Sequence, residues 1–263
     1  MNNMELTVII PVHKYTEKVR AYLTNAIASV KSLENSDDVK LMIVSPKSVD
    51  FGDDINYENV EFVNSKKSDF CSQVNEGVKN CKTKYFSILE LDDIFTEKWL
   101  INVEKEIEKG ESASLYLPLT ELYDDVEKKH VGYINEVVWA NSFSDELGFL
   151  DMESLSVYMN FNVTGGVFET EEFKNIGGLK PSIKLSFWYE FLLRMINNGN
   201  RVYVIPKTGY IHTINREDSL TSTYQKTMTQ DEADFYMDLA KKDYFFKKER
   251  DKSHYIFEEN ETK

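Results

Sequence analysis

Short apolar runs that alternate with amphipathic segments through the first hundred residues constrain the fold more than any other feature. The first run, residues 6–12, is apolar and rich in β-branched side chains, as expected of a parallel strand buried on both faces. Strands that alternate with helices at this spacing favour a parallel sheet of βαβ units, typical of a nucleotide-binding half. Further strands are predicted at 39–44, 59–63 and 85–91, with helices at 17–33, 70–81 and 99–109.

The pattern changes after about residue 110. A short apolar run at 114–119 is followed by a polar stretch that we expect to be rich in loops as far as about residue 160. Two glycine pairs, Gly165–Gly166 and Gly177–Gly178, mark places where the backbone turns tightly or approaches a ligand. A helix is predicted at 188–197, a strand at 201–205 and a final helix from about 231 to 250.

The charge balance limits the kind of partner. The chain of 263 residues carries 45 acidic and 31 basic side chains, a net charge of −14, so most of its surface would repel a polyanion. This balance disfavours a nucleic-acid partner unless a local basic patch creates a binding surface.

The final predicted helix is locally basic and aromatic although the protein is acidic. One interpretation is a solvated helix that packs through its aromatic side chains. The other is a surface that docks on a membrane near a lipid-linked acceptor, contacts a nucleic acid, or self-associates into a homo-oligomer. The residues concerned are Lys241, Lys242, Tyr244, Phe245, Phe246, Lys247, Lys248, Arg250 and Lys252.

The cysteines and the N-terminus both point to a reducing compartment. Cys71 and Cys81 are ten residues apart in a predicted helix, too far along it for an intrahelical bridge, and are expected to be free thiols. The N-terminal sequence MNNMELTVIIPV has no basic segment and only a short apolar run, so we predict neither a signal peptide nor a membrane span there. We therefore expect a cytoplasmic protein.

Three carboxylates crowd the end of the predicted strand at 85–91, in the sequence SILELDDIF, without a Lys or Arg among them. Glu90, Asp92 and Asp93 stand where open α/β sheets bind their ligands. Like charges so close raise one another's pKa, and a divalent cation that takes oxygen ligands, Mg²⁺ or Mn²⁺, would relieve the repulsion. The alternative is an acidic loop in which Asp93 merely caps the helix that begins near Trp99.

Five segments of the chain follow one another in a known order: VIIPVHKY, VNEGVKNCKTKYFSILELDDIF, GGVFETEEFKNIGGL, YEFLLRM and IHTINREDSLTS. Together they resemble the family 2 glycosyltransferases, and the resemblance covers residues 6 to about 222. It implies an α/β protein of the GT-A fold, with a single Rossmann-like, mostly parallel central sheet flanked by helices. It divides the chain into a GT-A domain at 1–222, with a nucleotide-binding half at 1–100 and an acceptor-binding half at 101–222, and a C-terminal helical extension at 223–263.

The resemblance implies a nucleotide-sugar donor, taken to be a UDP-sugar, and a divalent metal at the ends of the first and fourth predicted strands. Glu90-Leu91-Asp92 falls on the family's D-x-D motif, which holds Mn²⁺ or Mg²⁺ against the donor's diphosphate. The implied metal ligands are Asp92, Asp93 and His212. The implied donor contacts are Pro11, Val12, His13, Lys14, Ser45, Asn75, Glu90, Leu91 and Asp92.

The resemblance also implies inverting transfer to a hydroxyl acceptor, in which an acid takes the acceptor's proton while the nucleoside diphosphate leaves. Gly165, Gly166 and Trp188 are the implied acceptor contacts. Phe187 and Trp188 replace the acidic pair that family members carry at this place, so Glu190 is the candidate base. The alternative for Glu190 is a structural acid that pairs with an arginine.

Two further departures from the family pattern bear on the site. Residues 45–48, Ser-Pro-Lys-Ser, replace an acidic loop that helps to read the nucleobase, a role that would pass to Asp50, Asp53 or Asp69. Glu90 replaces the first Asp of D-x-D, which keeps the charge but adds a methylene.

The leading hypothesis is a metal-dependent glycosyltransferase. A second is a catalytically degenerate GT-A-like module that binds a sugar or a partner. A third is a nucleotidyltransferase, which the lack of a Gly-rich basic loop after the first strand disfavours. A glycan, a lipid-linked glycan and a modified nucleobase all fit as acceptors, the last disfavoured by the net charge.

Overall fold

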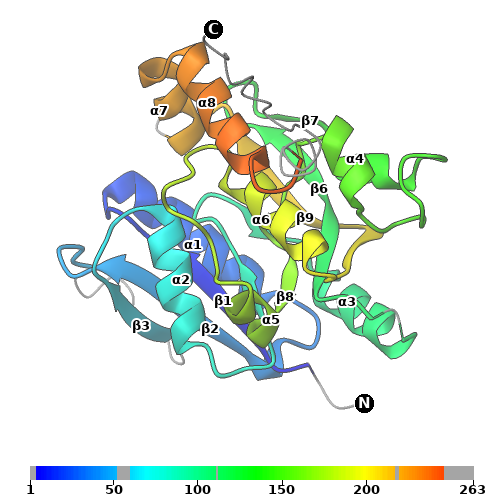
Figure 1. Ribbon diagram of the computed structural model, residues 1–263. Coiled ribbons are helices and arrows are strands. Elements are labelled where there is room, and N and C mark those ends of the chain that lie inside the picture. Colours follow the sequence, from blue (N-terminus) through cyan, green and yellow to red (C-terminus); the bar gives the residue numbers. More distant parts are fainter. Residues whose placement is uncertain (1–3, 52–59, 111, 217–218, 246–263) are drawn as a thin grey trace, which may run out of the picture.

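The protein is a mixed α/β structure built around one curved sheet of nine strands, with helices on both faces (Figure 1). The computed structural model describes residues 4–51, 60–110, 112–216 and 219–245. The predicted sheet flanked by helices is confirmed.

The N-terminal half of the sheet is parallel, as predicted. Four strands lie side by side, and each neighbouring pair runs in the same direction. The expected strands and helices of this half are present, with ends shifted by a few residues. In sheet order the strands are β3 (Val60–Ser65), β2 (Val39–Pro46), β1 (Leu6–Pro11) and β4 (Tyr85–Ile88); the helical segments are α1 (Glu17–Lys31), η1 (Ser36–Asp38), α2 (Phe70–Asn80) and α3 (Trp99–Glu108).

The sheet becomes mixed beyond β4. β8 (Val167–Glu169) runs antiparallel to both β4 and β6 (Leu115–Asp124), whereas β6 and β9 (Val202–Ile214) run parallel to each other. β5 (Ile94–Phe95) is antiparallel to β9 and ends the order. The parallel pairings are therefore those among β1 to β4 and the β6–β9 pair.

The stretch predicted to be rich in loops as far as about residue 160 also contains strands and short helices that the sequence pattern did not indicate. β6 continues as far as Asp124, and a turn then leads to a second strand that pairs with it antiparallel. That partner is mostly exposed and lacks a continuous apolar run, and the helices that follow are too short to show a helical period. The elements of this stretch are β7 (Lys129–Ile134), η3 (Glu136–Trp139) and α4 (Met152–Val157).

β9 is much longer than the strand predicted at 201–205. Pro206 has no N–H to donate to a ladder, so the pattern indicates an end there. The strand continues because Pro206 is exposed and lies where the register with β6 shifts, between Pro118 and Leu119. This continuation carries His212 to the turn after β4, where the candidate site lies.

Alternate residues of β1 enter two hydrophobic cores on opposite faces of the sheet. Ile9 packs with side chains of α2 and α6 (Phe187–Asn197), whereas Val8 and Ile10 pack with side chains of α1 and α3. Every residue of β1 is buried, which explains why its sequence is a continuous apolar run. α5 (Thr170–Asn175) follows β8.

Two helices, α7 (Leu220–Thr227) and α8 (Gln230–Lys241), follow β9, and α8 packs against α6 (Figure 1). α8 begins close to the expected residue, at a capping box made by Thr229 and Glu232. Most of the basic and aromatic patch, from Phe246 to Lys252, lies outside the described residues. Within the ranges that the structure describes, no helix is both long and apolar enough to cross a membrane.

Gly77 allows α2 to lie close to the sheet. A Cβ at this position would lie 2.8 Å from Cγ2 of Ile9 and 3.0 Å from Cγ2 of Val44. We predict that Gly77→Ala lowers the free energy of unfolding by about 1–3 kcal/mol through overpacking, although alanine is the better helix former. Urea denaturation measures the change.

Gly132→Ala is the matched control, because an added Cβ there meets no atom within 4 Å. Its free energy of unfolding should stay within about 0.5 kcal/mol of the wild-type value. Equal stability of the two variants would contradict the close packing of α2 on β1 and β2.

Candidate active site

The carboxylates of the SILELDDIF segment lie at the carboxyl end of β4. The Leu89 N–H donates to the Ile9 carbonyl at 3.0 Å, and the Asp93 N–H then donates back to the Glu90 carbonyl at 3.1 Å. The chain therefore leaves the sheet beside β1 in a tight turn over residues 90–93. This is the edge at which open α/β sheets bind their ligands.

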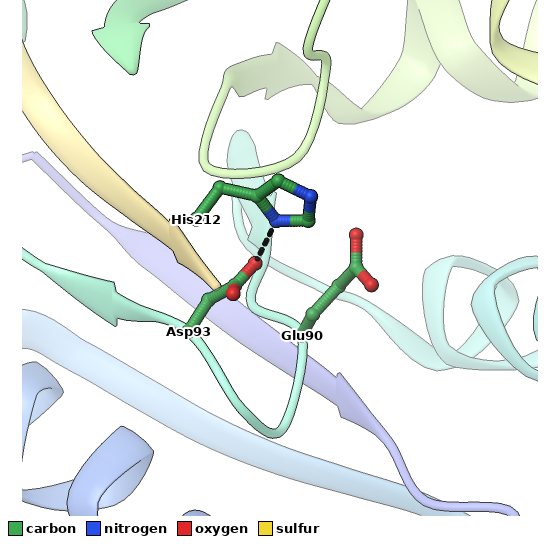
Figure 2. A group of neighbouring side chains, drawn as sticks. All are labelled: Glu90, Asp93 and His212. Atoms are coloured by element: carbon green, nitrogen blue, oxygen red, sulfur yellow. Dashed lines mark hydrogen bonds and ion pairs between the residues drawn. The ribbon is translucent and has the colours of Figure 1, made fainter. Parts of the chain in front are cut away.

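Glu90, Asp93 and His212 converge at this turn (Figure 2). One ligand atom from each of the three lies within 4.8 Å of the others. Asp93 is 1% exposed; one of its oxygens lies 2.8 Å from Nδ1 of His212, and the other accepts the N–H of Thr213 at 2.7 Å. β9 thus supplies both the third side chain and the backbone group that orients Asp93.

The crowding of these groups shifts their protonation. Burial, and then the Asp93 charge, raises the pKa of Glu90 to about 8. Burial alone would lower the pKa of His212, but the charge of Asp93 and the hydrogen bond with it raise that pKa to about 10. A divalent cation would relieve the repulsion between the Glu90 and Asp93 carboxylates and could accept the imidazole nitrogen of His212 as a ligand. The three residues therefore fit a metal ion.

Asp92 points to a different partner. Its carboxylate lies 2.7 Å from Nε of Arg216, and both side chains are less than 10% exposed. Its carbonyl accepts the Thr213 hydroxyl at 2.7 Å, and the Arg216 guanidinium lies over the ring of Tyr22 at 5.4 Å. Burial and the Asp93 charge raise the pKa of Asp92 to about 6, although Arg216 opposes the shift.

The group close enough to hold one ion therefore differs from the predicted ligand set in one member. Asp93 and His212 lie together as expected, but Glu90 joins them and Asp92 pairs with Arg216. Asp92 as a ligand stays a prediction. The sequence could not show that Arg216 pairs with Asp92, because the two positions are 124 residues apart and only the course of β9 brings them together.

The predicted donor contacts lie on the same sheet edge. Pro11 and Val12 are buried at the end of β1, whereas His13 and Lys14 are exposed beyond it. The buried amide of Gln73, which sequence reasoning missed, donates to the carbonyls of Val12 at 2.9 Å and Val44 at 3.1 Å. It fixes the ends of β1 and β2 where the donor is expected.

Ser45 and Asn75 have structural partners. Ser45 is buried on β2, in register with Asn64 of β3. The Asn75 side chain donates to the Leu179 carbonyl and accepts the Leu179 N–H, both at 2.8 Å. Asn75 therefore fastens α2 to the turn that follows Gly177–Gly178.

The predicted acceptor contacts lie in two places. The Gly165 N–H donates to the Ile88 carbonyl at 2.8 Å, and Nε1 of Trp99 donates to the Gly165 carbonyl at 2.9 Å, so the loop carrying Gly165 and Gly166 lies against the end of β4. Trp188 is half-buried, and its ring packs against Phe168 with a centroid distance of 6.2 Å. Its contacts are those of a side chain at the edge of the core.

Glu190 is 1% exposed and fully engaged. Its carboxylate accepts from Nε and Nη2 of Arg194 at 3.0 and 2.9 Å, from Nζ of Lys180 at 2.6 Å and from the Tyr244 hydroxyl at 2.8 Å. Burial would raise the pKa of Glu190, but the hydrogen bonds from Arg194 and Lys180 outweigh it and lower that pKa. These contacts favour the structural role weighed from the sequence, and its role as a base stays a prediction.

The fold and the acidic sheet edge together define a GT-A-type domain. The chain belongs to glycosyl transferase family 2, since the model of that family matches residues 7–163. The match includes the turn at 90–93 and ends before Glu190 and His212. A search of curated proteins finds no match.

Solved structures of S. aureus TarS share the fold. Its residues 1–349 in complex with UDP align with 16% identity and a TM-score of 0.60, over 84% of this chain and 63% of that one. The complex with UDP-GlcNAc aligns with the same identity and TM-score, over 90% of this chain and 65% of that one. The protein therefore spans less than two thirds of the length of these TarS structures.

The pairing of Glu190 makes a pH-dependent prediction. Glu190→Gln leaves two cations without their shared carboxylate and should lower the free energy of unfolding by about 3 kcal/mol at pH 7. The folded pKa of Glu190 is depressed, so its stabilisation is present above the unfolded pKa of about 4.3 and is lost as the pH falls through the lower folded value. Thermal unfolding from pH 7 to pH 3 should show the gap closing below about pH 4.3.

Glu171→Gln serves as the control, because this exposed side chain pairs with Lys174 on the surface of α5 and surface pairs contribute little. Its unfolding midpoint should follow the wild type at every pH. A gap for Glu190→Gln that stays constant down to pH 3 would contradict the assigned ion pairs.

The geometry also predicts different roles for Glu90 and Asp92. Glu90→Gln should weaken Mn²⁺ binding by about 10-fold or more, with little loss of thermal stability because it removes one of several like charges. Asp92→Asn should lower the thermal stability and leave Mn²⁺ affinity nearly unchanged, since it removes the partner of the buried Arg216. Calorimetric Mn²⁺ titration and thermal unfolding of both variants test this; a larger Mn²⁺ effect from Asp92→Asn would restore the ligand set predicted from the sequence.

Proposed function

We propose that this protein transfers a sugar from a UDP-sugar to a hydroxyl acceptor with the help of a divalent cation. The observation that carries the proposal is the convergence of Glu90, Asp93 and His212 at the sheet edge of a family 2 glycosyltransferase. The structural likeness to TarS in complex with UDP and with UDP-GlcNAc supports the donor class. Hexosyl and pentosyl donors both fit.

Mn²⁺ or Mg²⁺ is the proposed cofactor. Glu90 and Asp93 would supply oxygen ligands and His212 a nitrogen, a mixed set that favours Mn²⁺ over Mg²⁺. When bound, the cation would stabilise the negative charge that develops on the leaving nucleoside diphosphate. Arg216 and Thr213 would keep the turn at 90–93 in place through Asp92.

The donor would lie along the ends of β1, β2 and β4. The backbone of Pro11 and Val12, held by Gln73, and the exposed side chains of His13 and Lys14 are the proposed contacts on β1. Ser45 on β2 and Glu90, Leu91 and Asp92 in the turn after β4 complete the proposed set. Asn75 would contribute by fixing α2, because its amide is engaged by Leu179.

Inverting transfer needs a base for the acceptor hydroxyl, and Glu190 is the proposed one. Its carboxylate can take a proton only if the contacts with Lys180 and Tyr244 open, because these donors lower its pKa. We therefore propose that acceptor binding near Gly165, Gly166 and Trp188 displaces Tyr244 from Glu190. The acceptor class proposed is a glycan or a lipid-linked glycan.

The second candidate function is a GT-A-like module that binds a nucleotide sugar without transferring it. The full engagement of Glu190, together with Phe187 and Trp188 in place of an acidic pair, favours this candidate. The two candidates share the donor site and differ in turnover.

A donor panel tests the function. The protein is incubated with UDP-sugars of several classes, with Mn²⁺ or with EDTA, and release of UDP is measured beside equilibrium binding of each donor. We expect Mn²⁺-dependent binding of at least one UDP-sugar and slow release of UDP without acceptor. Binding without release supports the second candidate, whereas absence of both contradicts the donor site.

The same assay tests the base. Glu190→Gln should abolish UDP release but leave donor binding unchanged, because Glu190 does not touch the proposed donor contacts. Tyr244→Phe should leave release intact or raise it, since it frees one donor from the carboxylate. Full turnover by Glu190→Gln would assign Glu190 a structural role.

A further inference from the structure

Tyr210 is a fully buried side chain on β9, two residues before His212. It pairs across the sheet edge with Phe95 of β5, and the two rings meet edge to face with centroids 5.5 Å apart. None of the sequence motifs singled it out, because an apolar-flanked Tyr in a strand is usually a core residue.

The hydroxyl of Tyr210 reaches the turn that carries the acidic side chains. It accepts the N–H of Glu90 at 3.0 Å. Its own hydrogen needs an acceptor, because a buried Tyr hydroxyl seldom lacks one. Burial, and then the nearby charge of the Asp93 carboxylate, raises the pKa of Tyr210 well above its ordinary value.

The ring of Tyr210 is held in one position. A Cβ at Gly165 would lie 2.3 Å from Cδ2 of Tyr210, and Gly165 adopts φ +79°, so only glycine fits between this ring and the end of β4. Gly165 is itself bonded to Ile88 and Trp99. The hydroxyl is therefore held against the Glu90 N–H by a ring whose position is fixed by packing.

We propose that Tyr210 is the positioning residue of the metal site. Its hydroxyl accepts the Glu90 N–H and so holds the turn that presents Glu90 and Asp93 to His212 with the spacing a cation needs. This inference rests on the proposed metal binding by Glu90, Asp93 and His212. Groups that orient metal ligands typically change metal affinity by about 10–100-fold when they are removed.

The test compares Tyr210→Phe with Tyr116→Phe in the full chain. Tyr116 is the matched control: it is 3% exposed, lies on the adjacent β6, and its hydroxyl accepts one backbone N–H, that of Ala113, at 3.2 Å. The dissociation constant for Mn²⁺ alone is measured by electron paramagnetic resonance of the free ion, beside the thermal unfolding midpoint of each variant.

We expect Tyr210→Phe to weaken Mn²⁺ binding by about 10-fold or more, and Tyr116→Phe to change it less than about two-fold, although both lose a buried hydroxyl. Unchanged affinity in Tyr210→Phe, or equal weakening in both variants, overturns the inference. Failure of the wild type to bind Mn²⁺ overturns the proposed metal site and this inference with it.

If Tyr210→Phe does not fold, 4-fluorophenylalanine placed at Tyr210 replaces it in the test. The fluorine fills the position of the hydroxyl but donates no hydrogen, so the packing against Gly165 and Phe95 is kept. The same weakening of Mn²⁺ binding is expected, and wild-type affinity in this variant overturns the inference.

Discussion

The repulsion among three carboxylates at the end of β4 is the constraint on which the rest of the site depends. Glu90, Asp92 and Asp93 follow a strand that is buried over its whole length, so water cannot screen them as it would on a surface. Side chains and backbone groups of β9 and of the loop after it lie against two of these carboxylates. His212 and Thr213 contact Asp93, and Arg216 pairs with Asp92. Glu90 is left with a raised pKa, facing the place where a divalent cation would complete the balance.

The length of β9 is what brings these partners to the acidic turn. A strand that ended at Ile205, where the sequence pattern indicates, would leave the acidic turn without His212, Thr213 or Tyr210. The register shift beside Pro206 allows the strand to pass an exposed proline and reach the turn. The irregular pairing of β6 with β9 thus allows β9 to reach the acidic turn after β4.

The parallel half of the fold could be predicted because its signals are local. β1 is buried on both faces and shows it as a continuous apolar run, and Gly77 in α2 belongs to a recognisable segment. The hairpin of β6 and β7 is half-exposed, so polar residues interrupt its apolar pattern and the sequence indicates a loop there. Asp93 beside His212 was predicted, but whether Glu90 or Asp92 joins them could not be, because acids two residues apart differ only in the direction that the turn gives them.

The sequence allowed the pairing of Glu190 with Arg194, four residues along the same helix, but not the contacts from Lys180 and Tyr244, which come from other segments. The Tyr244 contact joins the segment after α8 to α6, so the C-terminal helices pack against the rest of the protein.

The central claim is that the acidic turn and β9 build one cation site. Anomalous diffraction from crystals grown with Mn²⁺ and UDP tests it most directly. The account predicts a single Mn²⁺ peak at bonding distance from Glu90, Asp93 and His212, with Asp92 still paired to Arg216. A peak held by Asp92 away from His212, or UDP bound at the sheet edge with no ion beside it, would contradict it.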